Sequence, residues 1–123
     1  QASFTNSCVV GVPDIAVAST VTISDTACGR ESSRYWVIVR NVGAGTLNIS
    51  SANITAGGTW FSKTDDSCSG RNLVGGEPCS IGIRLYAPVR GSRCPAEYYG
   101  TLRIISNDPD EGTVYVNLVG RGI

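Results

Sequence analysis

Short stretches in which β-branched or aromatic residues alternate with polar ones run through most of the chain. Clusters of Gly, Ser, Thr, Asn and Asp separate them about every 8–12 residues, a spacing typical of an all-β sandwich or barrel. The alternation predicts eight strands, each burying one face. They are Pro13–Ala18, Thr20–Ser24, Arg34–Asn41, Thr46–Thr55, Thr59–Ser62, Cys79–Ala87, Tyr99–Ser106 and Thr113–Val119. No segment has a convincing helical period, so we expect essentially no helix.

Seven or eight short strands in a chain of 123 residues indicate a single domain. This is the size of an immunoglobulin-like antiparallel β-sandwich. Residues 13–123 form the predicted domain, and residues 1–12 form an N-terminal arm that is uncharged and β-prone around Cys8–Val12. The arm either extends the first strand or pairs with the edge of a neighbouring molecule.

The predicted strand Arg34–Asn41 shows the clearest division into two faces. Tyr35, Val37 and Val39 are predicted to face the core, which directs Trp36 and Ile38 outward. In the last predicted hairpin, Ile105 and Tyr115 are likewise expected to point outward. Outward apolar side chains on a polar sandwich indicate a contact surface, although apolar residues scattered singly over a surface are also normal.

Composition and charge exclude several function classes. The chain has no His, which removes Ser-His-Asp and Cys-His catalysis and His-ligated metal sites. Ten basic and ten acidic residues give a formal net charge of +0, so no basic field attracts nucleic acid. No apolar run reaches the roughly 20 residues that span a bilayer. We therefore expect neither catalysis nor a cofactor.

Five cysteines lie at positions 8, 28, 68, 79 and 94, and no two of them have C-x-x-C spacing. This usage favours disulfides in an oxidising compartment, which predicts an extracellular, cell-surface or periplasmic location. Cys28 precedes one predicted strand and Cys94 follows another, Cys79–Ala87. These two strands are antiparallel neighbours in an immunoglobulin-like sheet, so we predict a Cys28–Cys94 bond. Cys8 remains as a buried or unreactive thiol, or as the site of an intermolecular bond or covalent attachment. A different pairing scheme among the five cysteines is the third alternative.

Two further features suggest ligands. Asp108, Asp110 and Glu111 offer carboxylate oxygens of the kind that Ca²⁺ binds, but in a register that differs from an EF-hand loop. A solvated hairpin turn is the simpler interpretation of this segment. Trp60, Tyr98 and Tyr99 could form an aromatic platform for carbohydrate, or could pack in the core or a loop.

The order of the turn and strand motifs along the chain resembles a known family. In chain order the motifs are Pro13-Asp14-Ile15, Asn41-Val42-Gly43, Gly45-Thr46-Leu47-Asn48-Ile49, Trp60-Phe61, Gly75-Gly76-Glu77-Pro78-Cys79, Gly100-Thr101-Leu102-Arg103-Ile104, Ser106-Asn107-Asp108 and Val116-Asn117-Leu118-Val119-Gly120. The pattern resembles choice-of-anchor D and ASPM–SPD–Hydin domains, within the MSP-like and PapD-like immunoglobulin folds. The resemblance covers residues 13–122, nearly the whole chain.

The resemblance implies a seven-stranded sandwich used as a non-enzymatic module, often in secreted or surface-attached bacterial proteins. It also implies a bond between Cys68 and Cys79, because related extracellular domains often carry a cysteine on each side of that loop. The additional Cys28 and Cys94, and the arm, depart from the family pattern.

These observations lead to one main functional hypothesis and two alternatives. The main hypothesis is a secreted or cell-surface module for protein interaction or structural scaffolding, which acts through strand edges and outward apolar residues. One alternative is a self-assembling fibre or oligomer subunit that uses the arm and Cys8. The other is a carbohydrate- or Ca²⁺-binding domain.

Overall fold

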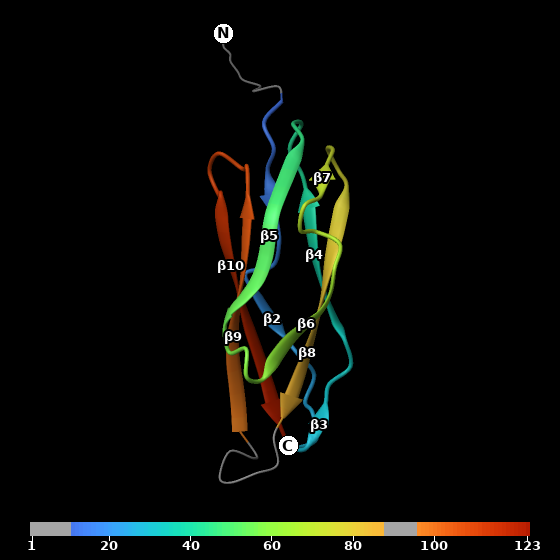
Figure 1. Ribbon diagram of the computed structural model, residues 1–123, viewed down its shortest axis with the longest axis vertical. Coiled ribbons are helices and arrows are strands. Elements are labelled where there is room, and N and C mark those ends of the chain that lie inside the picture. The colour runs from blue at the N-terminus through green and yellow to red at the C-terminus, as the bar shows by residue number, and fades with distance from the viewer. Residues whose placement is uncertain (1–10, 88–95) are drawn as a thin grey trace.

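The computed structural model describes residues 11–87 and 96–123, which fold into two stacked β-sheets (Figure 1). The predicted all-β sandwich is confirmed. Its strands are β1 (Ile15–Ala16), β2 (Thr20–Thr22), β3 (Arg30–Glu31), β4 (Tyr35–Asn41), β5 (Leu47–Ala56), β6 (Phe61–Asp66), β7 (Asn72–Leu73), β8 (Pro78–Ala87), β9 (Ala96–Ser106) and β10 (Thr113–Gly122).

The two sheets differ in strand order. In sheet I, β4 pairs with both β1 and β8, and β8 also pairs with β3 and β6. In sheet II the order is β2-β10-β9-β5-β7. The start of the domain contributes to both, because β1 pairs antiparallel with β4 while β2 pairs parallel with β10. The chain therefore leaves sheet I after Ala16 and crosses to sheet II by Thr20.

The core lies between the sheets and is built from alternate residues of the long strands. In β4, Val37 and Val39 are buried, and in β8 the row Ile81, Ile83 and Leu85 is fully buried. Sheet II supplies the opposite side of the core. Its buried apolar residues include Val21, Leu47, Ile49, Leu102, Ile104, Val116 and Leu118. The period of two in the sequence thus produces two apolar faces that pack against each other.

A buried asparagine joins the segments at one end of the sandwich. The Asn41 side chain is fully buried, and its Nδ2 donates to the carbonyl oxygens of Gly45 and Leu73. Its Oδ1 accepts the backbone N–H groups of Asp14 and Gly43. One side chain therefore connects the segment before β1, the turn after β4, and β7.

Several details differ from the sequence-based expectation. Tyr35 was predicted to face the core, yet 40% of it is exposed, because it is the first residue of β4 and lies beyond the packed centre. The predicted strands at 13–18 and 20–24 shrink to β1 and β2, since the crossing between sheets interrupts them. The short strand predicted at 59–62 is instead β6, which begins at Phe61. Neither β3 nor β7 was predicted, and two-residue strands leave little periodic signal.

Candidate interaction surface

The outer face of sheet I carries two large apolar side chains on β4. Trp36 is 43% exposed and Ile38 is 49% exposed. Their partners across β8 are small, since Trp36 lies opposite Gly82 and Ile38 opposite Ser80. The small neighbours leave both apolar side chains raised above the sheet. The outward direction predicted for both residues agrees with this arrangement.

An arginine crosses the sheet beside Trp36. The Arg34 guanidinium carbon lies 5.1 Å from the centre of the Trp36 ring, and Nε is 3.0 Å from an Asp65 carboxylate oxygen on β6. Gly82 makes this path possible, because a β-carbon there would lie 2.8 Å from Arg34 Cδ and from Thr64 Oγ1. Trp36 is thus supported from one side by a cation that is itself paired.

A shallow depression of about 340 Å³ lies next to Ile38 on this face. Ile38, Arg40, Ser67, Pro78, Cys79 and Ser80 line it. Its walls combine an apolar side chain, a cation and two hydroxyl groups. The surface therefore offers apolar contact together with hydrogen-bonding groups, as protein-binding surfaces commonly do.

Ile105 and Tyr115 do not belong to the same surface. They lie on β9 and β10 of sheet II, the sheet packed behind the core from Trp36 and Ile38. Tyr115 is 57% exposed, while Ile105 is half-buried. Pattern alone gave each residue a direction but could not say that the two pairs point away from each other.

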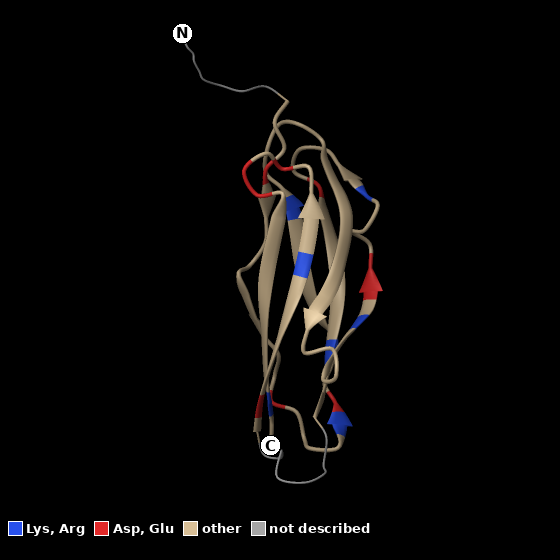
Figure 2. Ribbon diagram, turned by 60° about the vertical axis from the view of Figure 1, so that its left-hand side comes forward, with Lys and Arg blue, Asp and Glu red and all other residues tan. Residues whose placement is uncertain are grey.

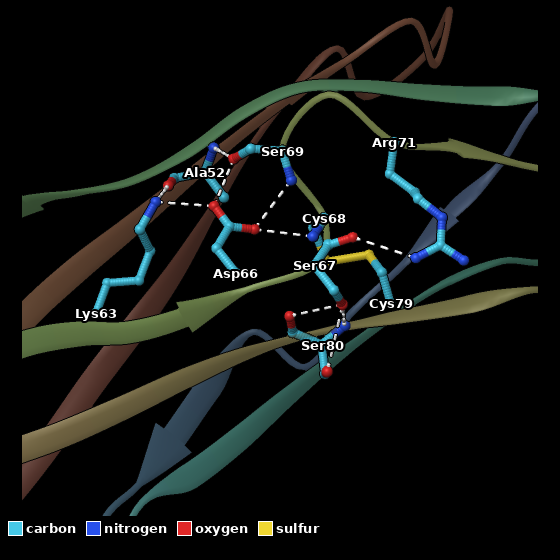
Figure 3. The surroundings of a disulfide bond; sticks show 9 residues. All are labelled: Ala52, Lys63, Asp66, Ser67, Cys68, Ser69, Arg71, Cys79 and Ser80. Atoms are coloured by element: carbon cyan, nitrogen blue, oxygen red, sulfur yellow. Dashed lines mark hydrogen bonds and ion pairs between the residues drawn. A yellow bond between two sulfur atoms is a disulfide. The ribbon is translucent and has the colours of Figure 1, made fainter.

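The disulfide between Cys68 and Cys79 joins the loop after β6 to the start of β8 (Figure 3). The pairing implied by the family resemblance is present, and both cysteines are buried. Cys28 is also disulfide-bonded. Its predicted partner Cys94 lies outside the described residues, as does Cys8, so the Cys28–Cys94 pairing stays a prediction.

Asp66 organises the loop that carries Cys68 (Figure 3). Its Oδ1 accepts the backbone N–H groups of Cys68 and Ser69, and its Oδ2 accepts from Lys63 Nζ at 2.8 Å. The same Nζ donates to the carbonyl oxygen of Ala52 on β5, at 2.7 Å. Because β6 belongs to sheet I and β5 to sheet II, this group of side chains closes one side of the sandwich.

The same contacts set the ionisation of Asp66. Burial alone would raise the pKa of this carboxyl, but hydrogen bonds from Lys63, Ser69 and the Cys68 N–H outweigh it and lower the pKa from 3.8 to about 2. The carboxylate thus stabilises the fold above the unfolded-state pKa, and the stabilisation disappears as the pH falls through about 2.

We expect the free energy of unfolding to drop by about 2 kcal/mol on acidification through this range because of Asp66 alone. Urea unfolding at a series of pH values measures the effect. The Asp66→Asn variant lacks the titrating group, so its difference from the wild type should shrink steadily as the pH falls below about 4. A difference that stays constant with pH would contradict the assignment.

The acidic turn between β9 and β10 is hydrogen-bonded to β1 through Asp108. Asp108 is 4% exposed, and its carboxylate accepts the backbone N–H groups of Ile15, Asp110 and Glu111. Burial would raise its pKa, but these three bonds lower it. Carboxylate oxygens of Asp14, Asp108 and Glu111 lie within 4.8 Å of one another. This group contains Asp14, which the sequence pattern did not indicate, and omits Asp110.

The three aromatic residues considered as a platform do not share a face. Tyr98 is buried, and its ring centre lies 5.3 Å from that of the half-buried Trp60. Tyr99, the next residue along β9, is 59% exposed, and its hydroxyl donates to Glu97. That acceptor raises the pKa of Tyr99. Since neighbouring strand residues point to opposite faces, the three rings form no common platform, and Trp60 and Tyr98 follow the packing alternative.

Charged residues are scattered along the strands and at both ends of the sandwich (Figure 2). The described part of the chain has no helix of the length and apolar character that a membrane crossing needs.

No family model matches the chain, and no curated protein matches it. Solved structures do. A protein of unknown function from Porphyromonas gingivalis W83 aligns with TM-score 0.73 and 15% identity over 91% of this chain and 48% of its own. PapD-like domain 7 of human CEP192 aligns with TM-score 0.61 and 13% identity over 100% and 93%. The periplasmic chaperone SfaE aligns with TM-score 0.58 and 12% identity over 89% and 57%.

These similarities identify the fold. The described residues form an immunoglobulin-like β-sandwich, and PapD-like domain 7 of CEP192 and the chaperone SfaE share this fold. The chain spans about half of the P. gingivalis protein and of SfaE.

Proposed function

We propose that this chain is a non-enzymatic protein-interaction module of a secreted or cell-surface protein, of the choice-of-anchor D kind. The observation that carries the proposal is the outer face of sheet I. There Trp36 and Ile38 are exposed side by side, next to a depression lined by both apolar and polar groups. Exposed apolar residues grouped in this way are typical of binding surfaces.

Two further features support the location and the absence of catalysis. The buried Cys68–Cys79 disulfide fits an oxidising compartment. The Asp108 carboxylate accepts the N–H group of Ile15 on β1 and those of Asp110 and Glu111 in its own turn, which favours a structural role for Asp108 over a catalytic or metal-binding one.

Site-specific photo-crosslinking tests the proposal. A photoreactive residue placed at Ile38 should crosslink a defined protein partner in the cells that make this protein. The same residue at Tyr115, which is similarly exposed but lies on sheet II, serves as the matched control. Equal crosslinking from both positions, or none from Ile38, would show that the outer face of sheet I is not the binding surface.

A further inference from the structure

The edge of β4 remote from β8 is covered along only part of its length. On that edge β1 pairs with Arg40 and Asn41 alone, through Ala16 and Ile15. The chain then crosses to sheet II, where β2 pairs with β10. No strand among the described residues lies along this edge between Tyr35 and Val39.

The direction of the backbone groups follows from the ladder. The backbone N–H and C=O groups of Asn41 point toward β8, since the N–H donates to Glu77 and the carbonyl oxygen accepts from Gly76. The direction of these groups alternates from residue to residue along a strand. The backbone groups of Trp36, Ile38 and Arg40 therefore point toward the edge of β4 that is remote from β8. Arg40 meets β1 there. The N–H and C=O groups of Trp36 and Ile38 have no strand partner within residues 11–87 and 96–123.

The other free edge of sheet I is built differently. Along β6 the register is broken between Lys63 and Asp65, and the exposed residues there include two charged side chains. A bulge and inserted charges are devices that prevent strand pairing. The β4 edge from Tyr35 to Val39 carries no charge, no Pro and no register shift.

We propose that the uncovered edge of β4 binds an extended peptide of another protein as an additional antiparallel strand of sheet I. The peptide would occupy the position that the chain itself leaves after Ala16, and would bond to the four free backbone groups of Trp36 and Ile38. This inference rests on the proposed function and specifies where on the module the partner binds.

The side chains around the edge define the chemistry of the peptide. Its residue opposite Trp36 is apolar, because that ring is the exposed contact on the outer face. Its residue opposite Ile38 is acidic, because a long side chain there reaches diagonally toward Arg40. Arg40 is exposed, and none of the ion pairs among the described residues includes it. One of its N–H groups donates to the carbonyl oxygen of Gly76 at 2.8 Å, so an incoming carboxylate would use the remaining guanidinium donors.

A second copy of this chain fits the edge less well. If two β4 strands paired antiparallel with Val37 at the centre, Arg40 of each copy would lie directly opposite Arg34 of the other, and like charges would meet. Ala16 would also occupy the position opposite Arg40, because β1 already pairs with it there.

The probe is the capped pentapeptide acetyl-Thr-Glu-Thr-Val-Thr-amide, whose Glu lies opposite Ile38 and whose Val lies opposite Trp36. Binding should shift the backbone amide resonances of residues 35–39 at a peptide concentration of about 5 mM, where millimolar affinity is detectable. N-methylation of the peptide's Glu removes the backbone hydrogen bond from that N–H to the carbonyl oxygen of Ile38, and should weaken binding at least tenfold. N-methylation of the central Thr, whose amide points away from β4, should change it less than twofold.

Variants of the protein test the edge from its own side. Ile38→Pro removes an N–H that the β4–β8 ladder does not use, so it should abolish binding while the protein still unfolds cooperatively. Ile38→Ala keeps that N–H and should retain binding within about threefold, since only side-chain contact is lost. Arg40→Glu should reverse the preference between the peptide and its Lys-for-Glu counterpart.

Three results would overturn the proposal. The first is the absence of shifts at residues 35–39, and the second is equal weakening by the two N-methyl groups. The third is a dimer of the free protein that Ile38→Pro dissociates, which would assign the edge to a second copy. If photo-crosslinking from Ile38 succeeds but the two N-methyl peptides bind equally, strand addition fails while the proposed interaction function stands.

Discussion

Replacing Asn41 with Asp is expected to cost about 3–5 kcal/mol of unfolding free energy, a large part of the stability of a domain of this size. The native Asn41 amide donates to the carbonyl oxygens of Gly45 and Leu73, at 2.6 and 2.8 Å. Aspartate has the same shape but no donor at that position. A carboxylate would therefore face two carbonyl oxygens at a fully buried site.

Chemical unfolding at neutral pH measures this cost, and Asn53→Asp is the matched control. Asn53 is exposed on β5, so the same change in charge there should stay within about 0.5 kcal/mol of the wild type. Acidification should recover part of the loss in Asn41→Asp, because a protonated carboxyl regains one donor. Equal effects of the two substitutions would show that the Asn41 side chain does not hold together the segment before β1, the turn after β4, and β7.

Replacing Gly57 with Ala is expected to destabilise the protein by about 2–4 kcal/mol, because two costs combine at one position. The φ angle of Gly57 is 75°, in the left-handed region that residues with a β-carbon rarely occupy. A β-carbon there would also lie 2.4 Å from the carbonyl oxygen of Tyr99 and 2.7 Å from Gly100 Cα. Both contacts are with the backbone of β9, which cannot move aside without disturbing the centre of sheet II.

The neighbouring glycine provides the control for this prediction. A β-carbon at Gly58 would meet no atom within 4 Å, and Gly58 is not among the glycines of positive φ. Gly58→Ala should therefore change the melting temperature little, while Gly57→Ala lowers it by roughly 10 °C or more. Similar melting temperatures for the two variants would contradict the close approach of this turn to β9.

The sequence predicted the long strands well, because each carries enough alternating residues to define a face. Val37 and Val39 are buried and Trp36 and Ile38 exposed, as the period of two required. Tyr35 shows the limit of that rule, since periodicity gives the direction of a side chain but not where the opposite sheet ends.

The candidate sites were less predictable. The acidic turn was visible as a cluster of carboxylates, yet the buried Asp108 bonds to Ile15, which lies far away in the sequence. Likewise, nothing in the local pattern around Lys63 indicates that its ammonium group reaches Ala52 in the other sheet. Such contacts depend on how the sheets stack, and a single strand contains no information about that.

Composition and local periodicity by themselves determined the class of structure and removed histidine-based catalysis, because both depend only on which residues are present and how they alternate. Tertiary structure decided which surfaces exist. It separated Trp36 and Ile38 from Ile105 and Tyr115, because β4 and the last hairpin belong to different sheets. It also left the β4 edge uncovered from Tyr35 to Val39, because the chain changes sheets after Ala16. Strand pairing is a long-range choice among backbone groups that are chemically alike, so side-chain pattern alone cannot specify it.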